Sequence, residues 1–179
     1  MQQRFAAPTI SVSLQDMLAA RERRVARRDA ALARYRLPVL SATLVMPGPE
    51  KNTGLARFLM SEGARAIENM LRARSWRLRH HASLSENTGI EAIYVVDADA
   101  HALKRALVDL EDNHPLGRLW DFDLNSPDGG SISRALIGNG PRRCLVCAEP
   151  GHACSRSQRH SLAELMDTIG RTVDDYHAR

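Results

Sequence analysis

Residues 76–98 read WRLRHHASLSENTGIEAIYVVDA, and this stretch decides how the chain folds. WRLRHHASLS (76–85) and EAIYVVDA (91–98) have the composition of β-strands, and the ENTG between them (86–89) is rich in turn-forming residues. We therefore predict two strands that follow each other directly, with no helix between them.

The segments on either side of this strand pair predict helices and a further strand. LPVLSATLVM (37–46) is an apolar and β-branched run that stops at Pro-Gly-Pro, which indicates a strand leading into a rigid loop. Apolar residues at helical spacing then predict a helix that begins near Thr53 or Gly54. After the strand pair, a similar stripe predicts a helix from about His101.

A last pair of extended segments completes the core. LWDFDLN (119–125), PDGG (127–130) and SISRALI (131–137) predict a strand, a tight turn and a returning strand. Residues 37–124 then have the order strand, helix, strand, strand, helix, strand. This order is the split pattern of a ferredoxin-like βαββαβ sheet layered with helices, so we predict an α+β fold.

The ends of the chain predict one helix each. Ser13 is a candidate N-cap of an amphipathic helix over residues 14–35, and Ser161 with Glu164 forms a candidate capping box before a C-terminal helix. The length fits one domain, 1–179. Its predicted parts are the N-terminal helix (14–35), the α+β core (37–137), a Cys/His loop (138–160) and the C-terminal helix (161–177).

The charge of the chain indicates anionic partners only mildly. Its 25 Lys and Arg against 21 Asp and Glu give a net charge of +4, which suits a nucleotide or an acidic protein but lacks the dense basic patch of a nucleic-acid-binding protein. Arg21, Arg23, Arg24, Arg27 and Arg28 crowd the first helix, and a solvated face is the favoured interpretation over a direct role in holding substrate or partner. The sequence contains neither a signal-peptide-like apolar stretch nor a run long enough to span a membrane, so we expect a cytoplasmic protein.

The cysteines predict a metal site. Cys144, Cys147 and Cys154 are the three cysteines of the chain, and His160 follows closely. Three thiolates and an imidazole are the ligands of a closed tetrahedral zinc site, and four protein ligands imply a structural role for Zn²⁺. His152 is an alternative fourth ligand, and unliganded or redox-active thiols are the alternative to a metal site.

Two carboxylates predict a second metal site. In a strand, Asp121 and Asp123 share one face about 7 Å apart at their Cα atoms, while Trp120, Phe122 and Leu124 point to the other face. Such a pair can hold Mg²⁺ together with substrate phosphates, as in metal-assisted phosphoryl transfer. The alternative is a half-buried strand with two acids in water.

Several cations near this pair are candidates for binding phosphate. Guanidinium groups match phosphate oxygens in pairs. The candidates are Arg118, Arg134, Arg142 and Arg143, with Lys51 as a further point charge. Each of them could instead be a surface cation. His114 is a candidate acid or base, with a structural hydrogen bond as the alternative.

Three segments together resemble a known family. They are PGPEK (47–51), HPLGRLWDFDL (114–124) and PRRCLVC (141–147), the last followed by Cys154, Arg156 and His160. They are similar to the apo-citrate lyase phosphoribosyl-dephospho-CoA transferases, also called holo-citrate-lyase acyl-carrier-protein synthases. The resemblance covers most of the chain, from the first helix to the last.

The resemblance implies a single-domain transferase of the nucleotidyltransferase type. The expected donor is 2′-(5″-triphosphoribosyl)-3′-dephospho-CoA, the expected acceptor is a serine of the citrate lyase acyl-carrier (gamma) subunit, and pyrophosphate leaves. No nucleic acid or membrane is expected as a partner. The residue roles rest on chemistry instead: Mg²⁺ on Asp121 and Asp123, with the arginines, would offset phosphate charge, and one of these carboxylates or His114 would take the serine proton.

Two other functions remain open at this point. The first is transfer of the same group to the carrier of a malonate decarboxylase. The second is a non-catalytic, zinc-stabilised basic module that binds RNA or an acidic protein. The aromatic content of 4% provides few surfaces for stacking bases, which counts against RNA.

Overall fold

The computed structural model describes residues 10–128 and 130–179. Its strands are β1 (Val39–Leu44), β2 (Arg77–Glu86), β3 (Gly89–Asp97), β4 (Trp120–Ser126) and β5 (Gly130–Ile132). Its helices are α1 (Leu14–Tyr35), α2 (Gly54–Ala73), α3 (Ala100–Asn113), α4 (Gly151–Arg156) and α5 (Leu162–His177), with short 3₁₀ turns η2 (Gly117–Leu119) and η3 (Ala135–Ile137). The predicted α+β class is confirmed, and β1, α2, β2, β3, α3 and β4 follow in the predicted order.

The strands form one antiparallel sheet in the order β2-β3-β1-β4-β5. β2 and β3 are the hairpin expected from residues 76–98, and Glu86 pairs with Gly89 where the chain turns. Gly89 has φ +127, a conformation that side-chain-bearing residues rarely adopt. The hairpin returns the chain to β1, which pairs with β3 on one side and β4 on the other.

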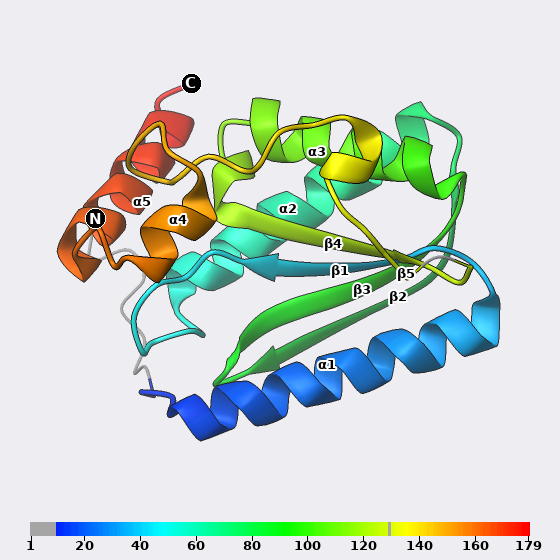
Figure 1. Cartoon of the computed structure of the whole chain (residues 1–179), viewed down its shortest axis with the longest axis horizontal. Helices are drawn as coiled ribbons and strands as arrows, with labels where there is room; N and C mark the ends of the chain where they lie inside the picture. Colours follow the sequence, from blue (N-terminus) through cyan, green and yellow to red (C-terminus); the bar gives the residue numbers. More distant parts are fainter. Residues whose placement is uncertain (1–9, 129) are drawn as a thin grey trace.

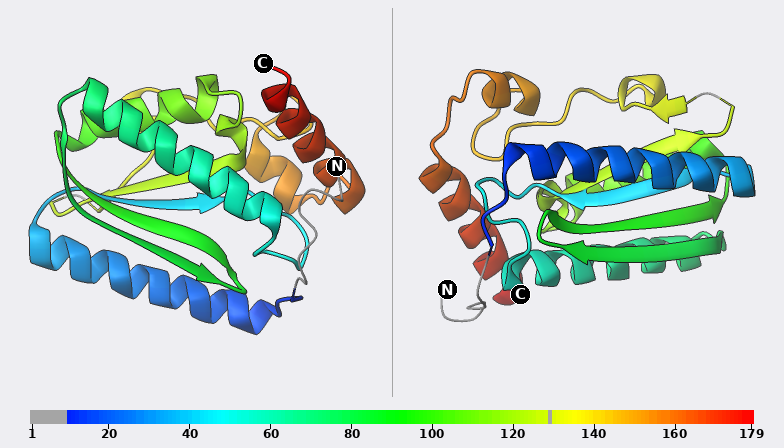
Figure 2. Two further views of the ribbon diagram at one scale, coloured as in Figure 1. Left: turned by 180° about the vertical axis from the view of Figure 1, so that it is seen from behind. Right: turned by 90° about the horizontal axis from the view of Figure 1, so that it is seen from below.

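Helices lie on both sides of this sheet, as Figures 1 and 2 show. α2 and α3 cover one face, where Leu40, Tyr94, Trp120 and Phe122 belong to the main core. α1 crosses the other face, where Ala31 packs on apolar residues of β1 and β3, namely Val39, Ile93 and Val95. Side chains of β4 that point away from the main core therefore lie on the α1 side of the sheet.

The outer edge of β4 is completed largely by side chains. The Phe122 N–H donates to Glu111 Oε1 at 2.8 Å, and Lys104 Nζ donates to the Phe122 carbonyl oxygen at 2.8 Å. Lys104 and Glu111 are both buried and both belong to α3. They bond backbone groups that would otherwise need another strand, because β5 pairs only with residues 124–126.

The predicted returning strand over residues 131–137 is wrong for most of its length. β5 ends at Ile132, and the chain then turns through η3. Arg134 bonds Glu111 and both oxygens of Asp112 on α3 instead of continuing the strand. Of the predicted PDGG turn, Gly129 lies outside the described residues.

Helix ends follow the predicted caps. Ser13 and Ser161 each form a capping box, with Asp16 and Glu164 respectively, and α1 has the predicted bounds. α5 places Ile169 in the main core. The segment predicted as a loop over residues 138–160 contains the short helix α4, which the sequence interpretation missed. Across residues 10–128 and 130–179, no helix has both the length and the apolar character needed to cross a membrane.

Candidate active site and metal centre

The two acids predicted to act together lie on the same side of β4. Trp120, Phe122 and Leu124 are buried in the main core, whereas Asp121 and Asp123 are accessible to solvent, and 48% of the Asp121 side chain is exposed. The strand alternation therefore directs both carboxylates away from the main core, toward the side on which α1 lies.

Two hydroxyl side chains of β1 stand directly opposite these acids. Ser41 pairs with Asp123 and Thr43 pairs with Asp121 in the antiparallel register, so each hydroxyl shares a face with its carboxylate. Ser41 is buried, and its Oγ has no hydrogen-bond partner among the described residues. The sequence interpretation missed both residues. Their alternation within LPVLSATLVM was a signal, but only the register of β1 with β4 connects them to the acids.

The electrostatics of the pair distinguish its two members. Desolvation by the surrounding protein, and then the negative charge of Asp121, raise the pKa of Asp123 above its ordinary value, while Lys104 partly opposes the shift. Arg24 of α1 faces the same site: burial lowers its pKa, and Asp123 and Asp121 act against that shift. The site thus holds neighbouring negative charges that repel each other.

Arg142 connects this pair to the chain that follows η3. Its Nη1 donates to Asp121 Oδ1 at 2.9 Å, and its Nη2 donates to the Trp120 carbonyl oxygen. Weaker contacts join Nη2 to the carbonyl oxygens of Gly117 and Arg118 at 3.4 and 3.3 Å. One guanidinium therefore orients the Asp121 carboxylate and occupies the open edge of β4.

Arg118 lies beside Arg142 and forms no ion pair with a carboxylate of residues 10–128 or 130–179. Its Nη1 is buried and makes no hydrogen bond within the described residues, and the Arg142 Nε is in the same situation. Burial lowers the pKa of Arg118, and the positive charges of Arg142 and Arg134 lower it further. Buried guanidinium N–H groups without a hydrogen-bond acceptor favour an anionic ligand.

Three other predicted site residues make contacts of their own. Arg134 is held by α3 acids, as described above. Lys51 donates to the Met46 carbonyl oxygen and lines a second, smaller pocket together with Arg24 and Thr43. His114 packs on Trp120 with ring centroids 4.5 Å apart, its Nδ1 accepts from the Leu116 N–H, and burial lowers its pKa. Because Trp120 points away from the acids, His114 lies on the opposite side of β4 and fits the structural alternative.

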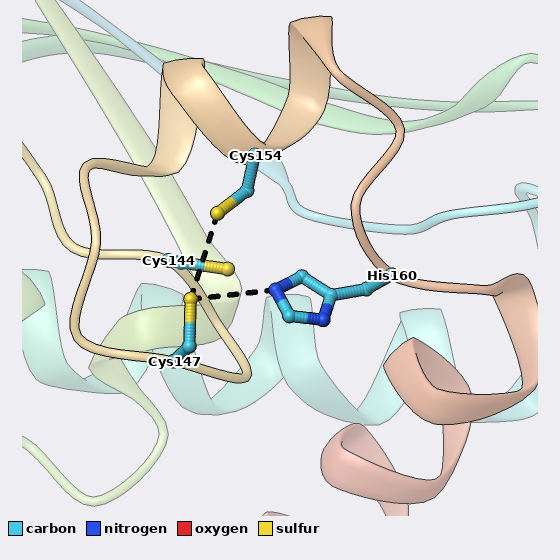
Figure 3. A group of neighbouring side chains, drawn as sticks. All are labelled: Cys144, Cys147, Cys154 and His160. Atoms are coloured by element: carbon cyan, nitrogen blue, oxygen red, sulfur yellow. Dashed lines mark hydrogen bonds between the residues drawn. The ribbon is translucent and has the colours of Figure 1, made fainter.

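The predicted metal ligands come together in one cluster (Figure 3). The ligand atoms of Cys144, Cys147, Cys154 and His160 all lie within 4.8 Å of one another. The Cys147 and Cys154 sulfurs are 3.5 Å apart, and His160 Nε2 lies 3.4 Å from the Cys147 sulfur. The cysteines are free thiols, and His160 rather than His152 is the histidine of the cluster. Such a cluster could hold a metal ion such as zinc.

Backbone geometry shapes the loop around this cluster. The Cys144 N–H donates to the Glu149 carbonyl oxygen at 2.7 Å, and the Gly151 N–H donates to the Arg142 carbonyl oxygen at 2.8 Å. Burial acts to raise the pKa of Cys144, but donation from the Cys147 and Val146 N–H groups outweighs it, and the pKa falls to about 7. Such N–H donors favour the thiolate, the form that binds metal.

A pocket of about 930 Å³ lies between the metal cluster and the end of the sheet. Arg118, Asp121, Arg142 and Arg143 line one part of it, and Arg143 is otherwise exposed. Other walls come from the loop after β1, from α4 and from the start of α5. Asp121 of the predicted acid pair, three predicted arginines and the predicted metal loop are therefore neighbours in space.

Comparison with known proteins identifies the family of the chain. The family described as apo-citrate lyase phosphoribosyl-dephospho-CoA transferase matches residues 12–176. The chain belongs to this family. A member from Escherichia coli O7:K1 is 36% identical over 168 residues, which are 94% of this chain and 92% of that protein. A member from Citrobacter koseri is 37% identical over 170 residues, which are 93% of each chain.

Membership identifies the chain as a transferase, and the earlier resemblance is confirmed. The match includes all of the core, the Cys/His segment and almost all of α5. It favours an enzyme over the non-catalytic, zinc-stabilised binding module.

Proposed function

We propose that the chain transfers the 2′-(5″-phosphoribosyl)-3′-dephospho-CoA group from its triphosphoribosyl donor to a serine of the citrate lyase acyl-carrier subunit. Pyrophosphate is the other product. The names of the relatives in Escherichia coli and Citrobacter koseri support the transferred group and the acceptor enzyme. The observation that carries the proposal is Asp121, the member of the β4 acid pair that bonds Arg142, together with Arg118 and its unbonded Nη1, at the wall of a large pocket.

Asp121 and Asp123 fit a divalent cation such as Mg²⁺. The raised pKa of Asp123, caused in part by Asp121, is the response of one carboxylate to another and would be relieved by a cation between them. Asp121 Oδ1 accepts from Arg142, which leaves its second oxygen as a ligand. When bound, Mg²⁺ would offset negative charge on the phosphate oxygens of the donor.

The proposed chemistry is a displacement at the phosphorus next to the ribose. The carrier serine oxygen forms a bond to that phosphorus while the bond from phosphorus to the oxygen of the leaving pyrophosphate breaks. One carboxylate of the pair, through an oxygen that does not bind Mg²⁺, takes the serine proton. Arg118, Arg142 and Arg143 bind the phosphates and offset the charge that moves to pyrophosphate.

We propose a structural role for Zn²⁺ at Cys144, Cys147, Cys154 and His160. Four protein ligands fill a tetrahedral zinc, so none of its positions is left for substrate. The metal would fix the segment that carries Arg142 against the sheet. Three free thiols that must stay reduced to bind metal fit a cytoplasmic protein.

We also assign the core to the ferredoxin-like class. The support is the strand order β2-β3-β1-β4 with antiparallel pairing throughout, together with helices α2 and α3 on one face.

The proposed reaction is tested by weighing the acceptor. The zinc-loaded protein is incubated with the triphosphoribosyl donor, Mg²⁺ and the apo-carrier of either citrate lyase or malonate decarboxylase, and each carrier is measured by intact-protein mass spectrometry. We expect the citrate lyase carrier to gain the mass of the phosphoribosyl-dephospho-CoA group on one serine. A gain on the malonate carrier alone would reassign the acceptor, and no gain on either would refute the transfer.

A further inference from the structure

The pocket beside the acid pair is larger than pyrophosphate needs and has two chemically different parts. Its volume of about 930 Å³ is near the upper end for small-molecule sites. One part is cationic, with Arg118 and Arg142. The other part is apolar, with Met46 from the loop after β1 and Leu162 and Leu165 from α5.

The apolar part exposes a side chain that the fold itself does not cover. Leu162 is 48% exposed although it lines the pocket, and it is one of the few large hydrophobic residues left exposed in the described part of the chain. One side of Leu162 lies close to Gly48, because a Cβ added to Gly48 would be 3.3 Å from Leu162 Cδ1. An apolar side chain held in place beside a cationic patch suits a ligand with both an anionic and an uncharged part.

We infer that this apolar part binds the uncharged portion of the CoA-like donor, its nucleoside or its pantetheine arm, while the cationic part binds its phosphates. The inference rests on the proposed function and specifies where its donor sits. A single ligand of this kind explains the volume of the pocket, the exposure of Leu162 and the unbonded Nη1 of Arg118. Phosphate alone would account only for the arginine.

The same geometry makes the metal cluster part of the donor site. The wall opposite the sheet is built by the metal loop itself, with Arg142, Leu145 and α4, and by the first turn of α5. His160 directly precedes Ser161, the N-cap of that helix, so a metal bound at the cluster would fix both the loop and the place where α5 begins. A metal that orders this wall would raise the affinity for the donor, and the donor would then raise the affinity for the metal by the same factor.

The site is tested by binding without turnover. Full-length, metal-loaded protein is titrated calorimetrically with dephospho-CoA whose thiol is methylated, so that the thiol cannot bind the metal. We expect saturable binding that Leu162→Asp weakens about tenfold or more. Leu136→Asp is the matched control, because Leu136 is a leucine of η3 that is 61% exposed and lines a different pocket. It should leave the affinity unchanged. Equal affinities for wild type and Leu162→Asp would overturn the inference.

Two further ligands distinguish the parts of the donor. ADP provides the nucleoside with phosphates, and phosphopantetheine provides the arm. The one that loses affinity with Leu162→Asp identifies the portion that occupies the apolar part. If neither ligand loses affinity, the inference is wrong.

The effect of donor binding on metal binding is measured separately, by the rate of zinc release. Zinc release to a chromophoric chelator should be slowed about tenfold or more by saturating methylated dephospho-CoA, and Leu162→Asp should abolish the slowing at the same ligand concentration. Unchanged release would contradict the linkage. These tests are independent of the proposed reaction: a protein that modifies the carrier but ignores Leu162→Asp refutes only the inference, and one that binds dephospho-CoA as expected but modifies no carrier refutes only the reaction.

Discussion

Arg142 Nη1 lies 2.9 Å from Asp121 Oδ1, and the same arginine stands two residues before Cys144, the first ligand of the metal cluster. The carbonyl oxygen of Arg142 accepts from the Gly151 N–H, at the start of α4, which carries Cys154. One residue thus joins the metal loop to the carboxylate pair of β4. The metal loop therefore contributes the positive charge of Arg142 to the proposed active site and orients Asp121. It contributes no ligand for the proposed Mg²⁺.

Arg142→Lys should separate these two roles of the arginine. A lysine keeps the charge but cannot bond the Asp121 carboxylate and the β4 edge at the same time, so we expect the transfer rate to fall about 100-fold with zinc still bound. Pre-steady-state transfer to the carrier and zinc content measure the two effects. Arg159→Lys, at an exposed position of the same loop, is the control. A normal rate in Arg142→Lys would show that the contact with Asp121 does not matter for transfer.

The two candidate histidines should differ in metal binding. His160→Ala should lower the zinc content below about one ion per chain and lower the melting temperature, because it removes one of four ligands. His152→Ala should change neither, since His152 is exposed and lies outside the cluster. Elemental analysis and thermal unfolding measure both. Full zinc content in His160→Ala would exclude it as a ligand.

The packing of α3 explains why position 117, in the segment HPLGRLWDFDL, is a glycine. A Cβ at this position would lie 2.2 Å from the Leu110 carbonyl oxygen, and that backbone atom cannot move aside without disturbing α3. Gly117→Ala should therefore destabilise the protein by about 3 kcal/mol or more, measured by urea unfolding. Gly140→Ala is the control, because no described residue other than its two chain neighbours has an atom within 4 Å of its added Cβ. A stability equal to wild type in Gly117→Ala would mean that η2 and α3 are not packed as described.

The stability of the protein should depend on pH through Asp123. Folding raises the pKa of this carboxyl, so the folded chain keeps the proton to a higher pH than the unfolded chain. The resulting stabilisation is present at low pH and is lost as the pH rises through the folded-state pKa. Above that pH, in buffer without Mg²⁺ and with zinc bound, Asp123→Asn should melt at a higher temperature than wild type, and the difference should shrink on acidification.

Asp167→Asn, at an exposed acid of α5, controls for the loss of one negative charge. Its melting temperature should follow that of wild type at every pH. If Asp123→Asn melts at a lower temperature than wild type at neutral pH, Asp123 is stabilising where it stands, and the repulsion within the pair is absent.

The sequence predicted those features that depend on local patterns. Helical spacing and Ser-x-x-acid caps predicted α1 and α5 closely, and strand alternation predicted that Asp121 and Asp123 share a face. Thiolate and imidazole spacing predicted a cluster of four ligands, but it left His160 and His152 as alternatives. Only the folded loop distinguishes them.

Features that depend on long-range contacts were missed. β5 is short because Lys104 and Glu111 bond the β4 edge, and no pattern within residues 131–137 reveals that competition. Arg134 and Arg142 looked equivalent as phosphate ligands, yet α3 acids hold the first and Asp121 holds the second. Ser41 was recognised as a neighbour of the acid pair only from its pairing with Asp123 in the sheet.

The proposed active centre is tested most directly by the single-turnover rate of transfer to the citrate lyase carrier. The rate is measured by mass spectrometry for wild type and for Asp121→Asn and Asp123→Asn, after each variant has been confirmed to be folded and to retain zinc. We predict that each substitution slows transfer about 1,000-fold, because each removes part of the charge that would hold Mg²⁺ against the donor phosphates. Transfer at the wild-type rate by either folded, zinc-loaded variant would contradict the assignment of this pair as the catalytic site.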